Sequence, residues 1–392
     1  MIEIVAEQGY DAVTVRELAR RSGVSTRAFY RHYSGKEECL LRVQHLVHKR
    51  ILGRLELADA RVVDDADRLR STIAAILDEW DRDLPAAHLA LIDSYAAGGA
   101  AWKQAWQASR SIERYLGGTL PPLVASGILS GVSWVVRLHL VSQEGHIASL
   151  GDELVRWALS YQDCSAAQLT EPNRSLALED QGQDLARPFP EGSGDLAAFL
   201  AAAVRLGAEE DRESITVGGI AAAAGLPRRG FYLRFQGVED CLDAALEARA
   251  GQLIALAEQA GNEHGKTPTD AVRRTAAALC DQVAADPNFA RFCFDGGPAA
   301  GAWRVRCHQR LIDAVAGVID RCTSSSGAGN LVTTASAAAL WGALQNEVMA
   351  GRGARLFEAA PACAYLLLAP HTGEPDGLGE LEVERGEHAL IA

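Results

Sequence analysis

Apolar residues recur every three or four positions along most of the chain, which is the spacing of one buried face of an α-helix. Alanine is abundant and runs of β-branched residues are few, so intrinsic propensity also favours helix. Gly and Pro interrupt the periodic stretches and mark turns between helices. We therefore expect an all-α fold, and the length of 392 residues predicts two or more domains.

The pattern near the N-terminus predicts a helix-turn-helix. Thr14 precedes VRELARRSG as an N-cap, with Glu17 at the spacing of a capping box. Gly23 ends that helix, and Ser25 caps the next one, TRAFYRHY. A longer helix with apolar residues at helical spacing begins near Lys36. The predicted core of this small unit consists of Leu18, Ala19, Val24, Phe29 and Tyr33.

The same pattern returns 202 positions later. Residues 14–40 and 216–242 are identical at 11 of 27 positions, too many for two unrelated amphipathic helices. An Ala/Leu-rich helical region follows each copy. In order, we expect a first helix-turn-helix head (1–45), a first helical ligand-binding or dimerisation domain (46–162), a flexible linker (163–195), a second, partly degenerate head (196–245), a second helical domain (246–370) and an acidic tail (371–392).

Charge is distributed unevenly between these regions. The net charge of −13 argues against a general polyanion binder, because an acidic surface repels phosphate. Residues 15–36 nevertheless hold six cations and one anion, and residues 217–238 hold three cations and no anion. Any contact with nucleic acid is therefore expected at the two heads.

A longer motif runs through the first copy: Thr14-Val15, Leu18-Ala19, Ser22-Gly23-Val24-Ser25, Phe29-Tyr30, His32-Tyr33 and Gly35-Lys36-Glu37. This motif resembles the N-terminal region of the TetR family of transcriptional regulators. The resemblance implies a DNA-binding head followed by a helical domain for ligand binding and dimerisation. It also implies a ligand-responsive regulator, more often a repressor, that binds a palindromic DNA operator as a homodimer.

The recognition helix of a helix-turn-helix places its N-terminal residues against base edges in the major groove. Ser25, Thr26 and Arg27 form that first turn, and the Arg27 guanidinium fits guanine O6 and N7. The family resemblance suggests phosphate or groove-edge contacts for Thr14, Tyr30, His32 and Lys36. The expected DNA-binding residues of the first head are Thr14, Arg16, Ser25, Thr26, Arg27, Tyr30, Arg31, His32 and Lys36.

The second head keeps the apolar pattern and changes the charged positions. Val238 replaces Lys36, Gly218 replaces Arg16, and Ala222-Ala223 replace Arg20-Arg21, which removes expected phosphate anchors. A basic recognition face remains, with Thr216, Arg228, Arg229, Tyr232 and Arg234 as its expected DNA-binding residues. The two recognition helices therefore predict different half-sites. Two units in one chain permit an intramolecular pseudo-dimer, and a homodimer of tandem chains is the other arrangement.

The helical domains are expected to take a small-molecule effector of unknown identity. A cavity lined by several tryptophans would suit an aromatic or lipophilic molecule, whereas ordinary core packing is the alternative explanation. The candidates are Trp80, Trp102, Trp106, Trp134 and Trp303.

The remaining function classes lack a motif. No GxSxG, P-loop, GxGxxG or HExxH pattern occurs, and we expect no catalytic residue, no metal site and no cofactor. The sequence has no signal peptide and no uninterrupted apolar stretch long enough to span a membrane, so a cytoplasmic protein is expected. The alternative to a DNA-binding regulator is a sensor or interaction module in which one or both heads no longer bind DNA.

Overall fold

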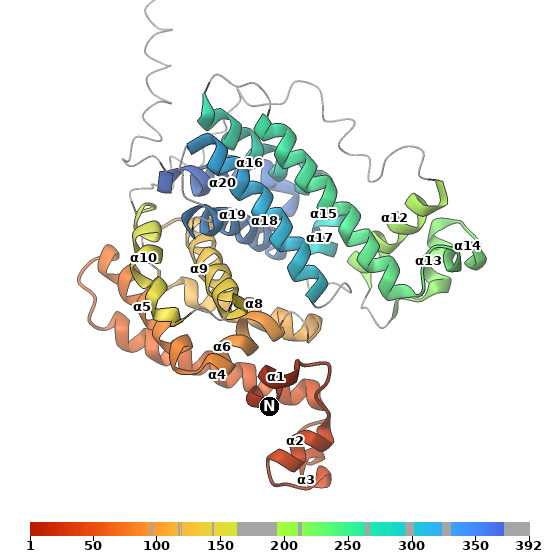
Figure 1. Ribbon diagram of the computed structural model, residues 1–392, viewed down its shortest axis with the longest axis horizontal. Coiled ribbons are helices and arrows are strands. Elements are labelled where there is room, and N and C mark those ends of the chain that lie inside the picture. The colour runs from red at the N-terminus through yellow and green to blue at the C-terminus, as the bar shows by residue number, and fades with distance from the viewer. Residues whose placement is uncertain are drawn as a thin grey trace, which may run out of the picture.

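The computed structural model describes residues 1–94, 97–116, 118, 120–142, 145–162, 194–210, 214–262, 267–294, 302–323 and 331–371. Every regular element in these residues is a helix, as the apolar periodicity predicts. Nearly all of the expected linker (163–195) and acidic tail (371–392) lies outside them. Figure 1 shows the first half of the chain at the lower left and the second half at the upper right.

The first half consists of α1 (Ile2–Gln8), α2 (Val15–Arg21), α3 (Thr26–Tyr30), α4 (Lys36–Asp59), α5 (Asp65–Arg82), α6 (Leu84–His88), the π-helix η1 (Leu89–Asp93), α8 (Gly99–Glu113), α9 (Pro122–Ser142), the 3-10 helix η2 (Ile147–Leu150) and α10 (Gly151–Leu159). The second half consists of α12 (Gly194–Glu209), α13 (Val217–Ala224), α14 (Arg228–Tyr232), α15 (Val238–Asn262), α16 (Pro268–Ala285), α17 (Pro287–Phe294), α18 (Ala302–Thr323), α19 (Leu331–Met349), the 3-10 helix η5 (Gly353–Ala359), α20 (Ala360–Leu368) and the 3-10 turn η6 (Ala369–His371).

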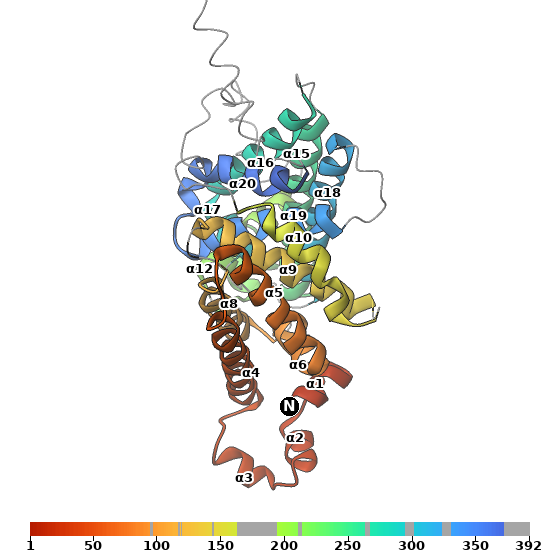
Figure 2. The ribbon, with the colours of Figure 1, turned by 90° about the vertical axis from the view of Figure 1, so that its left-hand side faces the viewer.

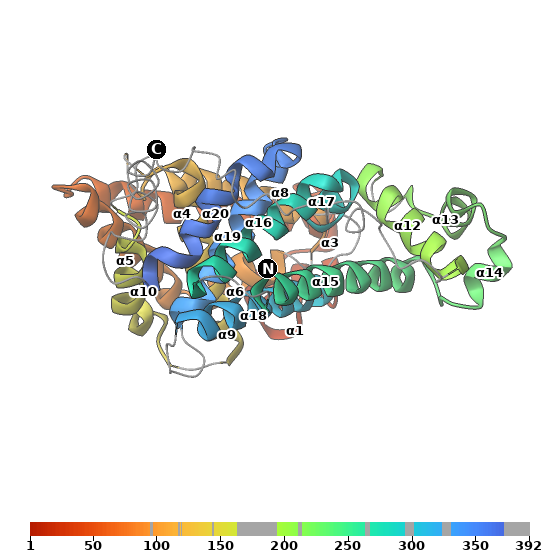
Figure 3. The same cartoon turned by 90° about the horizontal axis from the view of Figure 1, so that it is seen from above.

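In each half, one long helix continues from the head into the body of the molecule. Figure 2 shows α4 descending from the body to the first head, and Figure 3 shows α15 extending to the second head. Cys39 and Leu40 of α4 pack in the head core, whereas Val47, Ile51 and Leu55 pack in the body core. The apolar face of α4 is therefore buried in the head core near its N-terminus and in the body core further along. The expected boundaries at 45/46 and 245/246 therefore fall inside helices.

The two halves meet where α9 lies against α19. Small residues allow this close approach: a Cβ on Gly131 would stand 2.7 Å from the carbonyl oxygen of Ala335, and one on Gly127 would stand 3.3 Å from that of Ala339. The contacts are reciprocal, because α10 of the first half also reaches α19 and α20 of the second half reaches α9. The halves thus share one continuous body.

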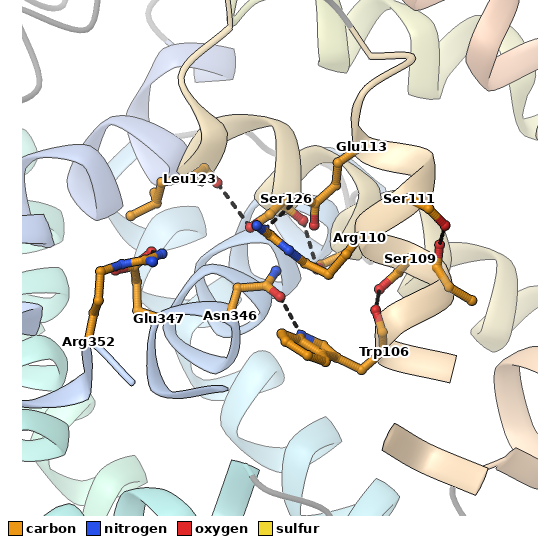
Figure 4. Close-up of polar contacts among 12 residues, drawn as sticks. Trp106, Ser109, Arg110, Ser111, Glu113, Leu123, Ser126, Asn346, Glu347 and Arg352 are labelled. Atoms are coloured by element: carbon orange, nitrogen blue, oxygen red, sulfur yellow. Dashed lines mark hydrogen bonds and ion pairs between the residues drawn. The ribbon is translucent and has the colours of Figure 1, made fainter. Parts of the chain in front are cut away.

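Polar contacts also join the two halves. The indole N–H of Trp157 donates to the Ser336 hydroxyl at 3.1 Å, and the Tyr161 hydroxyl donates to the carbonyl oxygen of Leu366 at 2.7 Å. Figure 4 shows the indole of Trp106 in α8 directed at the Asn346 side chain in α19, with a donor–acceptor distance of 2.6 Å. The bonds from Trp157 and Tyr161 satisfy polar groups that are buried between the halves.

Among the described residues, α9 is the one helix long and apolar enough to cross a membrane. About two thirds of its most apolar window is buried inside the molecule. Its packing against α19 accounts for that apolar surface, because a helix between two cores is apolar on all sides.

Candidate nucleic-acid interface

The first head is organised by its caps. The Thr14 hydroxyl oxygen accepts a hydrogen bond from the backbone N–H of Glu17 at 3.2 Å and so caps α2, as predicted. The reciprocal half of a capping box is not formed. The Glu17 carboxylate instead accepts two hydrogen bonds from the Arg20 guanidinium, at 2.6 and 2.9 Å. The capping-box prediction is therefore correct only for Thr14.

The turn between α2 and α3 places the recognition helix. Gly23 has φ 67°, a left-handed conformation that costs other residues energy, and the N–H of Val24 then bonds to the carbonyl of Ala19 at 3.0 Å. Ser25 caps α3 by accepting a hydrogen bond from the N–H of Ala28 at 3.1 Å. The turn directs the Val24 side chain outward, where 46% of the residue is exposed. The prediction that Val24 belongs to the core is wrong.

The remaining predicted core residues behave as expected. Leu18, Ala19 and Phe29 are buried, and Tyr33 is half-buried with its ring 5.2 Å from that of Phe29. Helix α1 completes this core with Ile4 and Val5, followed by Tyr10 and Val13 from the next loop. α3 is shorter than predicted, since it ends at Tyr30 and continues as a turn through His32.

The expected base-reading residues face solvent together. Ser25, Thr26 and Arg27 are exposed on the first turn of α3, and Tyr30, one turn further along, is 58% exposed. Arg16, Arg31 and His32 are exposed beside them, as is the capping residue Thr14. Arg16, Arg27 and Arg31 form no ion pair within the described part of the chain, so their charge is available to an external anion.

Other cations of the first head are already engaged. Arg20 pairs with Glu17 as described, and Arg21 binds Glu7 of α1 through contacts of 2.7 and 2.9 Å. The Lys36 ammonium lies 4.4 Å from the centre of the Tyr10 ring and donates to the carbonyl oxygens of Tyr10 and Asp11 at 3.2 and 3.3 Å. Arg21 thus ties α2 to α1, and Lys36 ties the start of α4 to the loop that follows α1.

Tyr10 remains a neutral phenol beside Lys36. Burial raises the pKa of its hydroxyl to about 12, with a further contribution from the nearby Glu37 carboxylate. The Lys36 ammonium therefore faces an aromatic ring and two backbone carbonyls rather than a phenolate.

The second head repeats this geometry at the 202-residue offset. Thr216 caps α13 by accepting from the N–H of Gly219 at 3.0 Å, and Gly225 has φ 68°. The N–H of Leu226 bonds to the carbonyl of Ala221 at 3.0 Å, as Val24 does to Ala19. The rings of Phe231 and Phe235 are 5.1 Å apart. Unlike Val24, Leu226 is half-buried and packs against the core.

The recognition face of the second head differs chemically. Arg228 and Arg229 are exposed, and Tyr232 is 63% exposed. Arg234 lies 3.7 Å from the Asp195 carboxylate of α12, which offsets part of its charge. Leu233, in the place of Arg31, is 78% exposed. This face is basic at its N-terminal end and apolar further along.

The tryptophans proposed as effector contacts occupy different environments. Trp80 and Trp102 are buried in the first half, and Trp134 is buried against the core of the second half. Trp106 is half-buried and bonded to Asn346, and the side chain of Trp303 lies outside the described part of the structure. Their role in effector binding stays a prediction.

A groove of about 450 Å³ lies between α1 and α4 in the first half. Its lining residues are Met1, Ile2, Glu3, Val43, Leu46, Val47 and Arg50. None of the proposed tryptophans belongs to it. No group of three or more His, Cys, Asp or Glu side chains suited to a metal ion occurs in the described residues.

The comparison with known families concerns the first head. Residues 2–43 match the sequence profile described as "Bacterial regulatory proteins, tetR family". Residues 2–43 form a TetR-family helix-turn-helix domain. This match covers α1 to α3 and the start of α4, which are the elements that present the exposed cations described above.

One curated protein and one solved structure are similar to parts of this chain. Over 93 residues the chain is 29% identical to the HTH-type transcriptional activator FasR of Mycolicibacterium smegmatis, which corresponds to 24% of this chain and 42% of that protein. The chain therefore matches about two fifths of the length of this relative. The structure of the fatty acid degradation regulator FadR from Bacillus halodurans superposes with a TM-score of 0.41 and 20% identity, over 46% of this chain and 97% of that chain.

Proposed function

We propose that this protein is a sequence-specific, DNA-binding transcriptional regulator whose two heads bind one asymmetric operator. The observation that carries the proposal is the exposed first turn of α3, where Ser25, Thr26 and the unpaired Arg27 face solvent together. Such a turn fits the major groove, and its guanidinium matches the two acceptors of guanine.

The arrangement of the halves supports an intramolecular pseudo-dimer. Helices α9 and α10 exchange contacts with α19 and α20 in a reciprocal pattern, as expected when two similar units face each other. The heads emerge on adjacent sides of the body in Figure 1. In this proposal residues 194–371 form a second TetR-like unit, and each head contacts its own half-site.

Regulation by a small molecule is part of the proposal. An effector bound within the helical body changes the relative position of the heads, because each head is continuous with the body through α4 or α15. Repression follows from occupancy of the operator. Activation, the activity in the name of the M. smegmatis relative, is the other outcome.

The test begins with the full chain and a randomised DNA duplex library. Selection should enrich a site with two dissimilar half-sites, and footprinting should protect both. A reporter placed behind the selected site then gives the sign of regulation. If no duplex is enriched above the non-specific background, the proposal is wrong and the sensor or interaction module is favoured.

The residues of the second recognition face favour the alternative function, in which a head no longer binds DNA, for the second head alone. Leu233 is exposed where the first head has Arg31, and Arg234 is partly neutralised by Asp195. If the second head does not bind DNA, the full chain should protect only one half-site in the same footprint.

A further inference from the structure

The second head lacks three arginines that the first head carries on its second helix. Gly218, Ala222 and Ala223 stand where the first head has Arg16, Arg20 and Arg21. If all three arginines held DNA phosphates, the second head would have lost most of its electrostatic affinity. The ion-pair partners of these three arginines determine how much unpaired positive charge the second head has lost.

Two of the three losses remove no free charge. Arg20 is bound to Glu17, and the second head replaces both members of that pair, with Ala222 and Gly219. Arg21 binds Glu7 and so ties α1 to α2.

The second head ties its corresponding helices together without that ion pair. Arg205 of α12 donates to the carbonyl oxygen of Ala223 at the end of α13, at 3.3 Å. This contact uses a cation in place of an ion pair, so the second head gains a positive charge here.

The loss of Arg16 is compensated by a cation on the recognition helix. Arg16 is the second residue of α2, and Gly218 is the second residue of α13. The guanidinium of Arg228 lies over Gly218, with Cζ 2.9 Å and Nε 3.1 Å from the point where a Cβ would stand. Arg228 can lie there only because residue 218 has no side chain. At the position of Arg228 the first head has Thr26, which is too short to reach α2.

We infer that Arg228 replaces Arg16 as a DNA-phosphate contact beside the second helix, and that Arg229 is the cation that reads bases in the second head. The inference rests on the proposed function and deepens it. A guanidinium held against α13 is placed for phosphate, whereas Arg229 keeps the position of Arg27 on the first turn. Pro227 also replaces Ser25 and offers no hydroxyl.

Phosphate contacts fix orientation but carry no sequence information. The second head is therefore expected to specify fewer base pairs of its half-site than the first head does. Its half-site in a selected duplex should be the more degenerate of the two.

The experiment uses the full chain and the duplex that the wild-type protein selects from a randomised library. Arg228→Thr should weaken binding by the same factor on every single-base variant of the half-site. The slope of log affinity against log salt should fall in magnitude by about 0.9, so that the loss of affinity between about 50 and about 200 mM salt becomes smaller by about 3.5-fold. The double variant Gly218→Arg/Arg228→Thr reproduces the first-head arrangement and should restore both properties.

The first head supplies the matched control. The reciprocal double variant Arg16→Gly/Thr26→Arg should keep wild-type salt dependence on the other half-site, whereas Arg16→Gly alone should lower it by about 0.9. Arg229→Ala should relax the base preference at one position of the second half-site.

The outcomes separate this inference from the proposed function. If Arg228→Thr changes the preference at one base pair, or if the double variant fails to restore the salt slope, Arg228 does not replace Arg16 and the inference is wrong. If Arg229→Ala and Arg228→Thr both leave binding and footprint unchanged, the second head does not bind DNA, and the two-headed function itself is wrong.

Discussion

Single exposed cations on the first head differ sharply in what surrounds them, and this difference gives the first prediction. Arg27 has no ion-pair partner among the described residues, whereas Arg20 is held by two bonds to Glu17. Arg27→Ala should weaken binding to the selected duplex by about 1–3 kcal/mol and relax preference at one base pair, because a bidentate base contact is lost. Quantitative binding to all single-base variants measures both effects.

The matched control is the double variant Glu17→Ala/Arg20→Ala, which removes both members of an ion pair and leaves the net charge of the head unchanged. It should change affinity much less than Arg27→Ala and should not alter base preference. Equal effects of the two variants, or unchanged specificity for Arg27→Ala, would show that α3 is not the reading helix.

For single residues, the sequence predicts the features that depend on local hydrogen bonding to the backbone. The caps at Thr14 and Ser25 follow from the hydrogen-bonding reach of short polar side chains, and both are present. The exposure of Val24 was missed because periodicity does not give the direction of a side chain inside a turn. The pairing of Arg21 with Glu7 was missed because the partners lie on different helices, 14 residues apart.

Among the helices, the contact between α9 and α19 is the most sensitive to added volume. A Cβ on Gly131 would stand 2.7 Å from the carbonyl oxygen of Ala335, which is closer than a carbon and an oxygen tolerate. Gly131→Ala should therefore lower the free energy of unfolding by about 1–3 kcal/mol, the usual cost of overpacking. Urea or thermal unfolding measures it.

Gly53 in the middle of α4 is the control for that substitution, because nothing lies within 4 Å of its added Cβ. Gly53→Ala should leave stability unchanged or raise it by up to about 1 kcal/mol, since alanine has the higher helix propensity. A neutral Gly131→Ala variant would contradict the close packing of the two helices.

A carboxyl group in α8 should make the body sensitive to pH. Burial raises the pKa of Glu113 from 4.5 to about 7, although Arg110 lies 2.7 Å away and acts in the opposite direction. Figure 4 shows both side chains near the start of α9. The folded protein therefore holds this proton more tightly than the unfolded chain, and the resulting stability is lost as pH rises from about 4.5 through 7.

The variant Glu113→Gln removes this titration. Its melting temperature relative to wild type should rise between about pH 5 and pH 8, because only the wild-type carboxyl must ionise in a buried site. Glu56→Gln, on the exposed face of α4, is the control and should show no such trend. A difference between Glu113→Gln and wild type that is constant with pH would contradict the raised pKa.

Helix existence was predicted well at this scale, whereas helix partners were not. The apolar stripes of α9 and α19 indicate burial, but a stripe does not name the helix that covers it. The glycines and alanines that bring these two helices together look, in the sequence alone, like ordinary helix interior. Recognising them would have required knowing that the two halves of the chain face each other.

For the whole molecule, the repeat at 202 residues predicts the number of chains on each operator. In the proposed pseudo-dimer a single chain supplies both heads, so the mass of the complex in solution should equal one chain plus one duplex. A homodimer of tandem chains would instead give two chains per duplex and a palindromic site. Light scattering or native mass spectrometry of the complex distinguishes these masses.

Variants that alter one head at a time test the number of chains on each operator without a mass measurement. Thr26 of the first recognition helix corresponds to Arg228 of the second. Each head should therefore protect a different half-site. Arg27→Ala should then weaken protection of one half-site and Arg229→Ala that of the other, with the unaltered half-site protected as in the wild type. If Arg27→Ala weakens protection of both half-sites while Arg229→Ala changes neither, two copies of the first head occupy the operator. The second unit would then contribute its helical body to the assembly, and the molecule would be a dimer of tandem chains.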